Sequence, residues 1–217
     1  MAAALLAQPA RAQDIAEAAP PIAVDPAVGD YSSTQMELAA GLRLNRDGTF
    51  EYGLTVGSLD ERARGRWTRV GDRIELVSDP RPVAPTITAS RVEQGPDDAF
   101  AIRLVAPNGR DIPGIDLRID FDIGQPLESY VAGEPWTLPA DETRRPRFVT
   151  FSKESYRIDS GPLPLRADAG TVAIFLLTPN DFGVVDLTGA YLEPRGDGLV
   201  LTRPDGTIRF ARAIASD

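Results

Sequence analysis

The sequence contains no cysteine, no histidine and a single lysine, Lys153. Without cysteine, the chain cannot form disulfides, thiolate nucleophiles, zinc–thiolate sites or iron–sulfur clusters. Without histidine, it lacks the commonest general base at neutral pH and any Ser–His or Cys–His catalytic pair. These absences remove the chemistries that need a thiolate or an imidazole, but not a pair of carboxylates. We predict no catalytic residues, no metal site and no cofactor.

Negative charge outweighs positive charge, because the 217-residue chain has 32 Asp and Glu residues against 23 Lys and Arg residues, a formal net charge of −9. An acidic surface of this kind disfavours nucleic acids and anionic membranes as partners. The sequence contains no phosphate-binding loop and no dinucleotide-binding fingerprint. It also has no apolar run long enough to span a membrane. We therefore expect neither a nucleic-acid partner nor a transmembrane segment.

The N-terminus reads "MAAALLAQPARAQD", in which Ala10-Arg11-Ala12 has the small-x-small pattern of a cleavage site after a short apolar run. Two interpretations remain open. Residues 1–12 are the remnant of a signal peptide that starts upstream, or they are an Ala-rich tail. The Pro/Ala-rich stretch 13–28 follows as a linker would, which favours the first interpretation. We expect an exported protein of the bacterial envelope, either periplasmic or secreted.

Two similar stretches, "LNRDGTFEY" and "LTRPDGTIRF", lie near opposite ends of the chain. In each, an Asp-Gly pair separates two runs in which apolar and polar residues alternate. Asp-Gly supports the positive φ angles of a tight hairpin, and strict alternation indicates a strand with one buried face. We interpret the recurrence as the same turn chemistry used twice.

The alternation predicts an all-β, antiparallel fold with very little helix. Residues 42–78 read as a four-stranded meander, and 86–92 as a fifth strand of the same unit. Residues 93–98 are the candidate linker. We therefore predict a meander or barrel-like unit over 29–92 and a sandwich-like unit over 98–212.

Two segments stand out in the predicted sandwich-like unit. Residues 115–123 alternate most regularly, as a half-buried strand would. Residues 171–178, "TVAIFLLT", are apolar on both faces, so we place them in the middle of a sheet. Shorter strands are expected at 147–151 and 155–158, and three more after residue 190.

The first unit resembles lipocalin-like and META-like barrels of bacterial envelope proteins over residues 41–77. The shared pattern is a strand, an Asp-Gly turn, an aromatic strand, a Gly-x-Trp strand and a Gly-Asp turn. The residues that carry it are Asp47, Gly48, Phe50, Tyr52, Gly65, Trp67, Gly71 and Asp72. The resemblance implies a small antiparallel barrel. Lipocalins place Gly-x-Trp on the first strand, whereas here it falls on the third.

The second unit resembles transthyretin-like, or carboxypeptidase-regulatory-like, modules over residues 100–124. Here the shared pattern is a strand, a Pro-Asn-Gly turn, an "IPG" step and a second strand. It is carried by Asn108, Gly109, Pro113, Gly114 and Ile115. Both resemblances imply binding or scaffold modules.

Aromatic residues are the first candidates for ligand contacts. Tyr52 and Trp67 lie at inward-facing positions of their strands, where they either line a pocket or pack in the core. Trp136 sits in the Pro/Gly-rich stretch "GEPWTLP", where it is either a lid or a contact surface.

Arg144, Arg145 and Arg147 form the only dense basic cluster. Guanidinium groups suit a carboxylate, a phosphate or a sugar acid. The neighbouring acids, Asp141 and Glu142, favour the alternative of a solvated loop. We keep the three arginines as candidate ligand-binding residues.

Two other patterns favour ordinary surface roles. Asp116, Asp120 and Asp122 share a strand face, but side chains two apart on a strand stand about 6.5–7 Å apart, too far for one cation without loop ligands. Ser152 and Lys153 are adjacent, and adjacent strand residues point to opposite faces, which argues against a Ser/Lys nucleophile.

These observations predict a non-catalytic envelope protein that acts as a binding or scaffold module for another envelope protein or for a small molecule. The alternative is a carrier that holds a small apolar ligand inside its barrel. A hydrolase with a pair of carboxylates is a distant alternative, since no spacing selects a pair.

Overall fold

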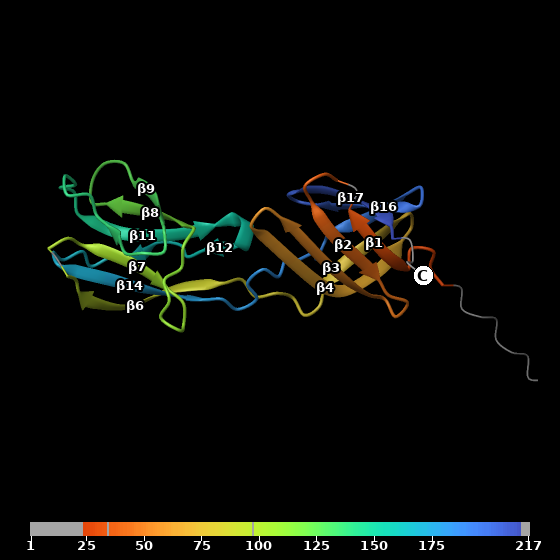
Figure 1. Cartoon of the computed structure of the whole chain (residues 1–217), viewed down its shortest axis with the longest axis horizontal. Helices are drawn as coiled ribbons and strands as arrows, with labels where there is room; N and C mark the ends of the chain where they lie inside the picture. The colour runs from red at the N-terminus through yellow and green to blue at the C-terminus, as the bar shows by residue number, and fades with distance from the viewer. Residues whose placement is uncertain (1–23, 34, 97, 214–217) are drawn as a thin grey trace, which may run out of the picture.

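The computed structural model describes residues 24–33, 35–96 and 98–213, and these form two β units joined end to end (Figure 1). The first unit is a closed barrel of eight strands with the order β1-β17-β16-β15-β5-β4-β3-β2. Its strands are β1 Gly29–Ser33, β2 Ala39–Leu44, β3 Thr49–Val56, β4 Leu59–Val70, β5 Arg73–Ser78, β15 Tyr191–Arg195, β16 Gly198–Arg203 and β17 Gly206–Arg212.

Strands β2 to β5 are the predicted meander. The Asp47-Gly48 pair lies in the turn between β2 and β3, with Gly48 at a φ of 80°, and the Asp47 carboxylate accepts a hydrogen bond from the Thr49 amide. Gly65 on β4 has a different role. A Cβ atom there would overlap the backbone of Val77 and Ser78 on β5, so only glycine lets these strands approach.

The two ends of the chain close the barrel, because β1 pairs with β17 in the register Tyr31↔Arg212. The strands after residue 190 therefore belong to the barrel, and the predicted division into 29–92 and 98–212 assigned them to the wrong unit. The hairpin of β16 and β17 was predicted, but local turn chemistry does not say which sheet a hairpin joins. Only pairing between distant strands decides that.

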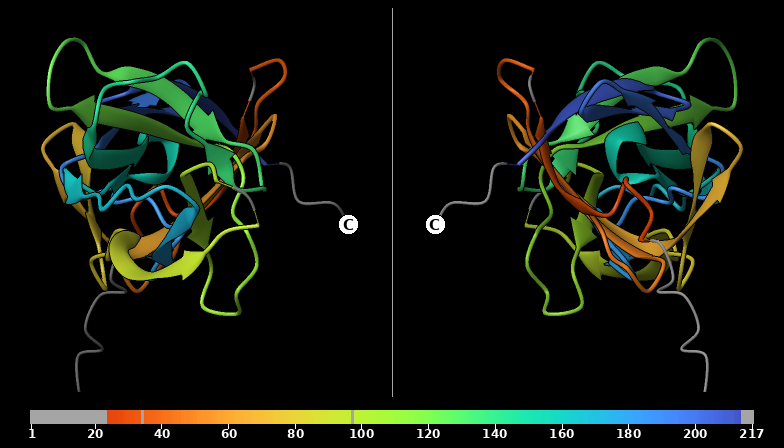
Figure 2. Two further views of the ribbon diagram at one scale, coloured as in Figure 1. Left: turned by 90° about the vertical axis from the view of Figure 1, so that its left-hand side faces the viewer. Right: turned by 90° about the vertical axis from the view of Figure 1, so that its right-hand side faces the viewer.

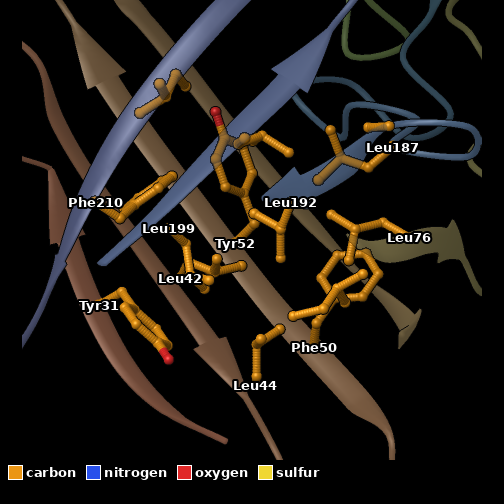
Figure 3. Close-up of a cluster of buried hydrophobic side chains, with 14 of the residues drawn as sticks. Tyr31, Leu42, Leu44, Phe50, Tyr52, Leu76, Leu187, Leu192, Leu199 and Phe210 are labelled. Atoms are coloured by element: carbon orange, nitrogen blue, oxygen red, sulfur yellow. The ribbon is translucent and has the colours of Figure 1, made fainter. Parts of the chain in front are cut away.

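Buried side chains fill the barrel interior (Figure 3). Alternate residues of each strand point inward, as the period of two predicts. Leu187 enters the same cluster from the connection between the two units and is 1% exposed. The labelled members of this core are Tyr31, Leu42, Leu44, Phe50, Tyr52, Leu76, Leu187, Leu192, Leu199 and Phe210.

The second unit comprises two sheets. One has four strands in the order β10-β7-β14-β6, and the other has the order β12-β11-β8-β9, with β13 paired to β11. The bounds are β6 Thr86–Gln94, β7 Ala101–Val105, β8 Ile115–Phe121, β9 Leu127–Val131, β10 Trp136–Thr137, β11 Pro146–Lys153, β12 Ile158–Asp159, β13 Leu163–Pro164 and β14 Thr171–Thr178.

The inner faces of these sheets form one core, in which the rings of Phe151 and Phe175 meet edge to face at 5.1 Å. β14 lies inside its sheet and is buried on both faces, as predicted. It pairs with β7 in parallel and with β6 in antiparallel fashion. Among the strand pairs that the structure describes, β7–β14 is the parallel one, and the others are antiparallel.

Two local predictions were wrong. β6 pairs with β14, so it belongs to the sandwich and not to the meander. Residues 155–158 were predicted as a strand, but Glu154–Tyr156 form a short 3-10 helix and β12 begins only at Ile158. Arg157 has a φ of 56°, which breaks the extended backbone at this point.

Two connections, residues 79–85 and 179–190, run between the barrel and the sandwich (Figures 1 and 2). They are held to each other by hydrogen bonds. The amide of Val83 donates to the Asp181 carboxylate at 2.8 Å, and the Asn180 side chain donates to the carbonyl of Ala84 at 2.9 Å. The predicted leader 1–12 and most of the predicted linker 13–28 lie outside the described residues.

Candidate functional site

The barrel residues predicted to line a pocket lie apart. Tyr52 is buried near the end of the barrel that faces the sandwich. Trp67 lies near the opposite end, where its indole N–H donates to the carbonyl of Asn45 at 3.1 Å. Trp67 is partly buried and packs against the barrel core. The two side chains therefore do not form one site.

Trp136 lies in the sandwich, on the two-residue strand β10. It packs against the sandwich core, and its indole N–H donates to the Ser129 hydroxyl at 3.0 Å. These contacts attach the loop after β9 to the sheets. In the structure, Trp136 joins two parts of one unit and is remote from Tyr52.

The three clustered arginines do not converge. Arg144 forms a two-pronged ion pair with Glu142, at 2.6 and 2.9 Å, and its guanidinium lies 4.0 Å from the centre of the Phe121 ring. Arg145 and Arg147 are exposed. Arg144 is thus engaged within the loop that carries it.

A polar cluster at the sandwich-facing mouth of the barrel was not predicted as a unit. The guanidinium of Arg203 donates to Glu61 at 2.6 Å and to Asp205 at 2.7 Å, and it lies 3.4 Å from the Tyr52 hydroxyl. The side chains of Arg203 and Glu61 are each only 10% exposed. We call these four residues the mouth cluster.

Burial and charge set the protonation states of the mouth cluster. Burial raises the pKa of the Tyr52 hydroxyl well above its usual range, so this group stays neutral. Burial by itself lowers the pKa of the Arg203 guanidinium, but the hydrogen bond that it donates to Glu61 and the nearby negative groups leave this pKa raised. The positive charge of Arg203 is therefore balanced by its acidic partners, and this ion pair covers one end of the apolar barrel core.

A hollow of about 330 Å³ lies beside the mouth cluster, between the two units. Glu61 and Asp205 line it from the barrel, and the 3-10 helix lines it from the sandwich, with Glu154 and Tyr156. Arg157 closes this side, because its guanidinium donates to the backbone carbonyl of Val184 at 2.9 Å.

A second and larger hollow, about 620 Å³, lies on the other side of Tyr156; we call it the junction cleft. Both units and the second connection contribute to it. Its lining is mostly apolar, and consists of Ser58, Ala106, Pro107, Ile112, Pro113, Gly114, Ile115, Lys153, Tyr156, Leu177, Pro179 and Phe182. Clefts of about 300–1,000 Å³ at the junction of two units are typical places for small ligands.

Tyr156 holds the junction together beside the cleft. Its ring stacks on Phe182, with 4.3 Å between the centroids, and its hydroxyl donates to the carbonyl of Ser58 at 3.0 Å. A residue of the sandwich thus binds both the barrel and the connection. Phe182 remains 38% exposed, so the stack also presents an apolar face to the cleft.

Lys153 is the single charged residue in the lining of the junction cleft. It ends β11, and its ammonium group lies 3.4 Å from the carboxylate of Asp116 on the neighbouring strand β8. Both side chains are partly exposed. The cleft therefore combines an apolar wall with one positive charge.

The aspartates of β8 bind cations of the protein itself. Asp120 pairs with Arg118 at 2.8 Å, and Asp116 pairs with Lys153. Among the residues that the structure describes, no group of three or more acidic side chains is placed to hold a metal ion. Within the same residues, no helix has the length and apolar character needed to cross a membrane.

Comparison with known proteins gives no relative from which to assign a role. The chain matches no family model, no curated protein and no solved structure. The evidence for function therefore comes from the geometry described above.

The sequence carried a weak signal for the junction cleft. Proline, glycine and short apolar residues over 106–115 predict a turn between strands. Lys153 stands out in the sequence as the single lysine and as a neighbour of Ser152, and neither feature points to a cleft. Nothing local indicates that residues near positions 58, 110, 153 and 180 meet, because their approach depends on the order of strands in two units.

Proposed function

We propose that this protein is a non-catalytic binding module and that its ligand site is the junction cleft. The observation that carries this proposal is the cleft itself, about 620 Å³ in volume and lined by apolar side chains from both units. Apolar surface that remains accessible in a recessed site is a common feature of ligand binding.

The filled barrel interior supports this location. The buried cluster of the barrel occupies the space that a carrier would need for a ligand, and the mouth cluster closes the end that faces the sandwich. A small apolar ligand carried by this protein would therefore lie between the units and not inside the barrel.

The mouth cluster favours binding over hydrolysis. Glu61 and Asp205 lie on the same side of the junction, but both are ion-paired to Arg203. A hydrolytic pair needs one carboxyl group with a raised pKa to act as an acid. Where a carboxyl pKa is shifted among the described residues, it is lowered, as in Asp25, Asp47, Glu142 and Asp186.

The location in the bacterial envelope is part of the proposal. It is supported by the leader-like residues 1–12 and by the linker-like composition that follows them. The lipocalin-like and META-like pattern of residues 41–77 supports a module of the kind found in that compartment. The transthyretin-like pattern of residues 100–124 supports a binding or scaffold module.

The proposal is tested with a neutral apolar dye, N-phenyl-1-naphthylamine, whose fluorescence rises when it leaves water. We expect saturable binding to the full chain. Ala106→Trp places a large ring in the cleft and should abolish binding, because Ala106 is part of the lining. Val92→Trp is the matched control, since Val92 is a half-exposed residue of β6 outside that lining.

Equal dye binding by the two variants would contradict the proposed site. A circular dichroism spectrum of each variant shows whether the β structure is intact. Loss of binding in both variants, with intact spectra, would likewise place the dye elsewhere.

A further inference from the structure

We propose that the ligand of the junction cleft is a small amphipathic carboxylate, such as a medium-chain fatty acid, whose carboxylate binds Lys153. This inference rests on the proposed function and adds the chemical class of the ligand. It follows from the charge, the lining and the size of the cleft.

The first argument is the state of Lys153. Its ion pair with Asp116 is long, at 3.4 Å, and the Asp116 side chain is 57% exposed. Exposed pairs of this kind contribute little and exchange readily with other partners. By contrast, Arg144 is bound to Glu142 at 2.6 Å, and Arg103 to Asp111 at 2.8 Å. The ammonium group of Lys153 can therefore donate hydrogen bonds to the carboxylate of a ligand in place of Asp116.

The second argument is the chemistry of the wall. Ile112, Ile115, Leu177 and Phe182 present aliphatic and aromatic groups, and three prolines stiffen the rim. A wall of this type binds hydrocarbon and offers a sugar few polar groups, since Ser58, Lys153 and Tyr156 are the residues of the lining with polar side chains. One cation at the side of an apolar hollow matches a ligand with one anionic group and an apolar body.

The third argument is shape. The cleft is a recess bounded by segments of both units and the second connection, and its volume of about 620 Å³ suits a small molecule. An interface with a second copy of the chain or with another protein needs a broad face of at least about 1,000 Å² in total. We therefore assign the cleft to a small ligand.

The test compares two ligands that differ only in the head group. Decanoate and 1-decanol are titrated against the dye bound to the full chain. We expect decanoate to displace the dye at a concentration about tenfold lower than decanol, because only decanoate forms a charge-assisted hydrogen bond with Lys153. Affinity should rise about fourfold for each methylene added to the carboxylate until the cleft is filled.

Three variants test whether the preference for decanoate depends on Lys153. Lys153→Gln should remove the preference for decanoate and leave decanol unchanged, and Lys153→Arg should keep most of the preference. Arg166→Gln removes one positive charge from an exposed loop of the same unit, outside the cleft lining, and should behave as the parent. Lys153 is partly exposed, so these changes leave the core intact.

The outcomes separate the two proposals. If Lys153→Gln retains the preference for decanoate, the assigned head-group site is wrong, while dye binding blocked by Ala106→Trp would still support the cleft. If neither ligand displaces the dye from the parent chain, the assigned ligand class is wrong. If the dye does not bind at all, and calorimetry shows no heat with decanoate, both proposals fail. Displacement accompanied by dimerisation in sedimentation would indicate a second copy as the occupant and overturn the inference.

Discussion

The barrel and the sandwich differ in how they use the chain. The sandwich is built from one continuous stretch, residues 86–178, whereas the barrel is built from residues 29–78 and 191–212. The sandwich thus lies within the barrel in sequence and beside it in space (Figure 1). We therefore expect the barrel to need the folded sandwich to bring its two chain segments together, and we expect the sandwich to fold without the barrel.

The units also differ in how each ends at the junction. The barrel presents an ion-paired cluster, in which Arg203 binds Glu61 and Asp205, and the sandwich presents apolar residues with Lys153. The same junction therefore has a polar hollow and an apolar cleft on either side of Tyr156. A ligand with one polar group and an apolar body is complementary to a junction of this kind.

The largest expected effect comes from removing β15 to β17. A chain that ends at residue 190 should lose the barrel and keep the sandwich, because the barrel core loses Leu192, Leu199 and Phe210. The two tryptophans report on each unit separately, since Trp67 packs in the barrel and Trp136 in the sandwich. We expect a red-shifted emission from Trp67 and an unchanged emission from Trp136, measured in Trp→Phe variants of the other position.

Exposure of Trp136 in the shortened chain would contradict the difference proposed between the two units. If Trp136 also became exposed in the shortened chain, the sandwich would depend on the barrel as much as the barrel depends on it. A chain cut only after residue 213 is the control, because it keeps β1 to β17, the strands that the structure describes.

The next effect concerns two matched aromatic residues. Phe50 in the barrel and Phe151 in the sandwich are 1% and 0% exposed. Replacing either by alanine should lower the free energy of unfolding of its own unit by about 3–5 kcal/mol, since a large buried cavity is left behind. Urea unfolding followed through the fluorescence of Trp67 measures the stability of the barrel, and the fluorescence of Trp136 measures that of the sandwich. Phe50→Ala is expected to shift mainly the Trp67 transition, and Phe151→Ala to shift both, because the barrel needs a folded insertion.

A smaller effect should separate the ion pairs. Arg203→Leu removes the guanidinium that pairs with Glu61, whose side chain is only 10% exposed. The unpaired carboxylate should lower the free energy of unfolding of the barrel by about 3 kcal/mol. Arg103→Leu in the sandwich breaks a pair with Asp111 whose members are 29% and 26% exposed, and should cost about 1 kcal/mol or less. Urea midpoints of the two variants test this order, and equal midpoints would contradict it.

The smallest expected effect is on how the stability of the sandwich depends on pH. The hydrogen bond from Arg144 lowers the pKa of Glu142 to about 2. Because the folded pKa lies below the unfolded one, this contribution to stability is present above the ordinary pKa of a glutamate and is lost as the pH falls towards 2. Glu142→Gln should therefore lower the free energy of unfolding at pH 7, and this loss should shrink as the pH falls through 2. Urea unfolding followed through Trp136 emission measures it. A loss of equal size at pH 7 and pH 2 would show that Glu142 acts in another way.

Much of the fold could be predicted from local patterns. Alternation identified the strands of the meander and of β8, and the Asp-Gly pairs identified two hairpins. β14 was correctly placed inside a sheet because it is apolar on both faces. These are properties of short segments, so a single sequence is enough to show them.

Pairing between distant segments could not be predicted. Nothing near Tyr31 indicates that it pairs with Arg212, and nothing near Ala101 indicates a parallel partner at Val172. The candidate site depends on such pairings. Tyr52 was predicted as a ligand contact, and the structure places its hydroxyl in the mouth cluster. Its partners there, Glu61 and Arg203, are 142 positions apart in sequence and meet only when the barrel closes.

The most direct test of the account is the position of a bound ligand. A crystal of the full chain grown with decanoate brominated at its methyl end can be searched for bromine by anomalous scattering. We expect one strong peak in the junction cleft among Ile112, Leu177 and Phe182, with the carboxylate within hydrogen-bonding distance of the Lys153 ammonium group. A peak inside the barrel, or on an outer face away from Lys153, would contradict the account.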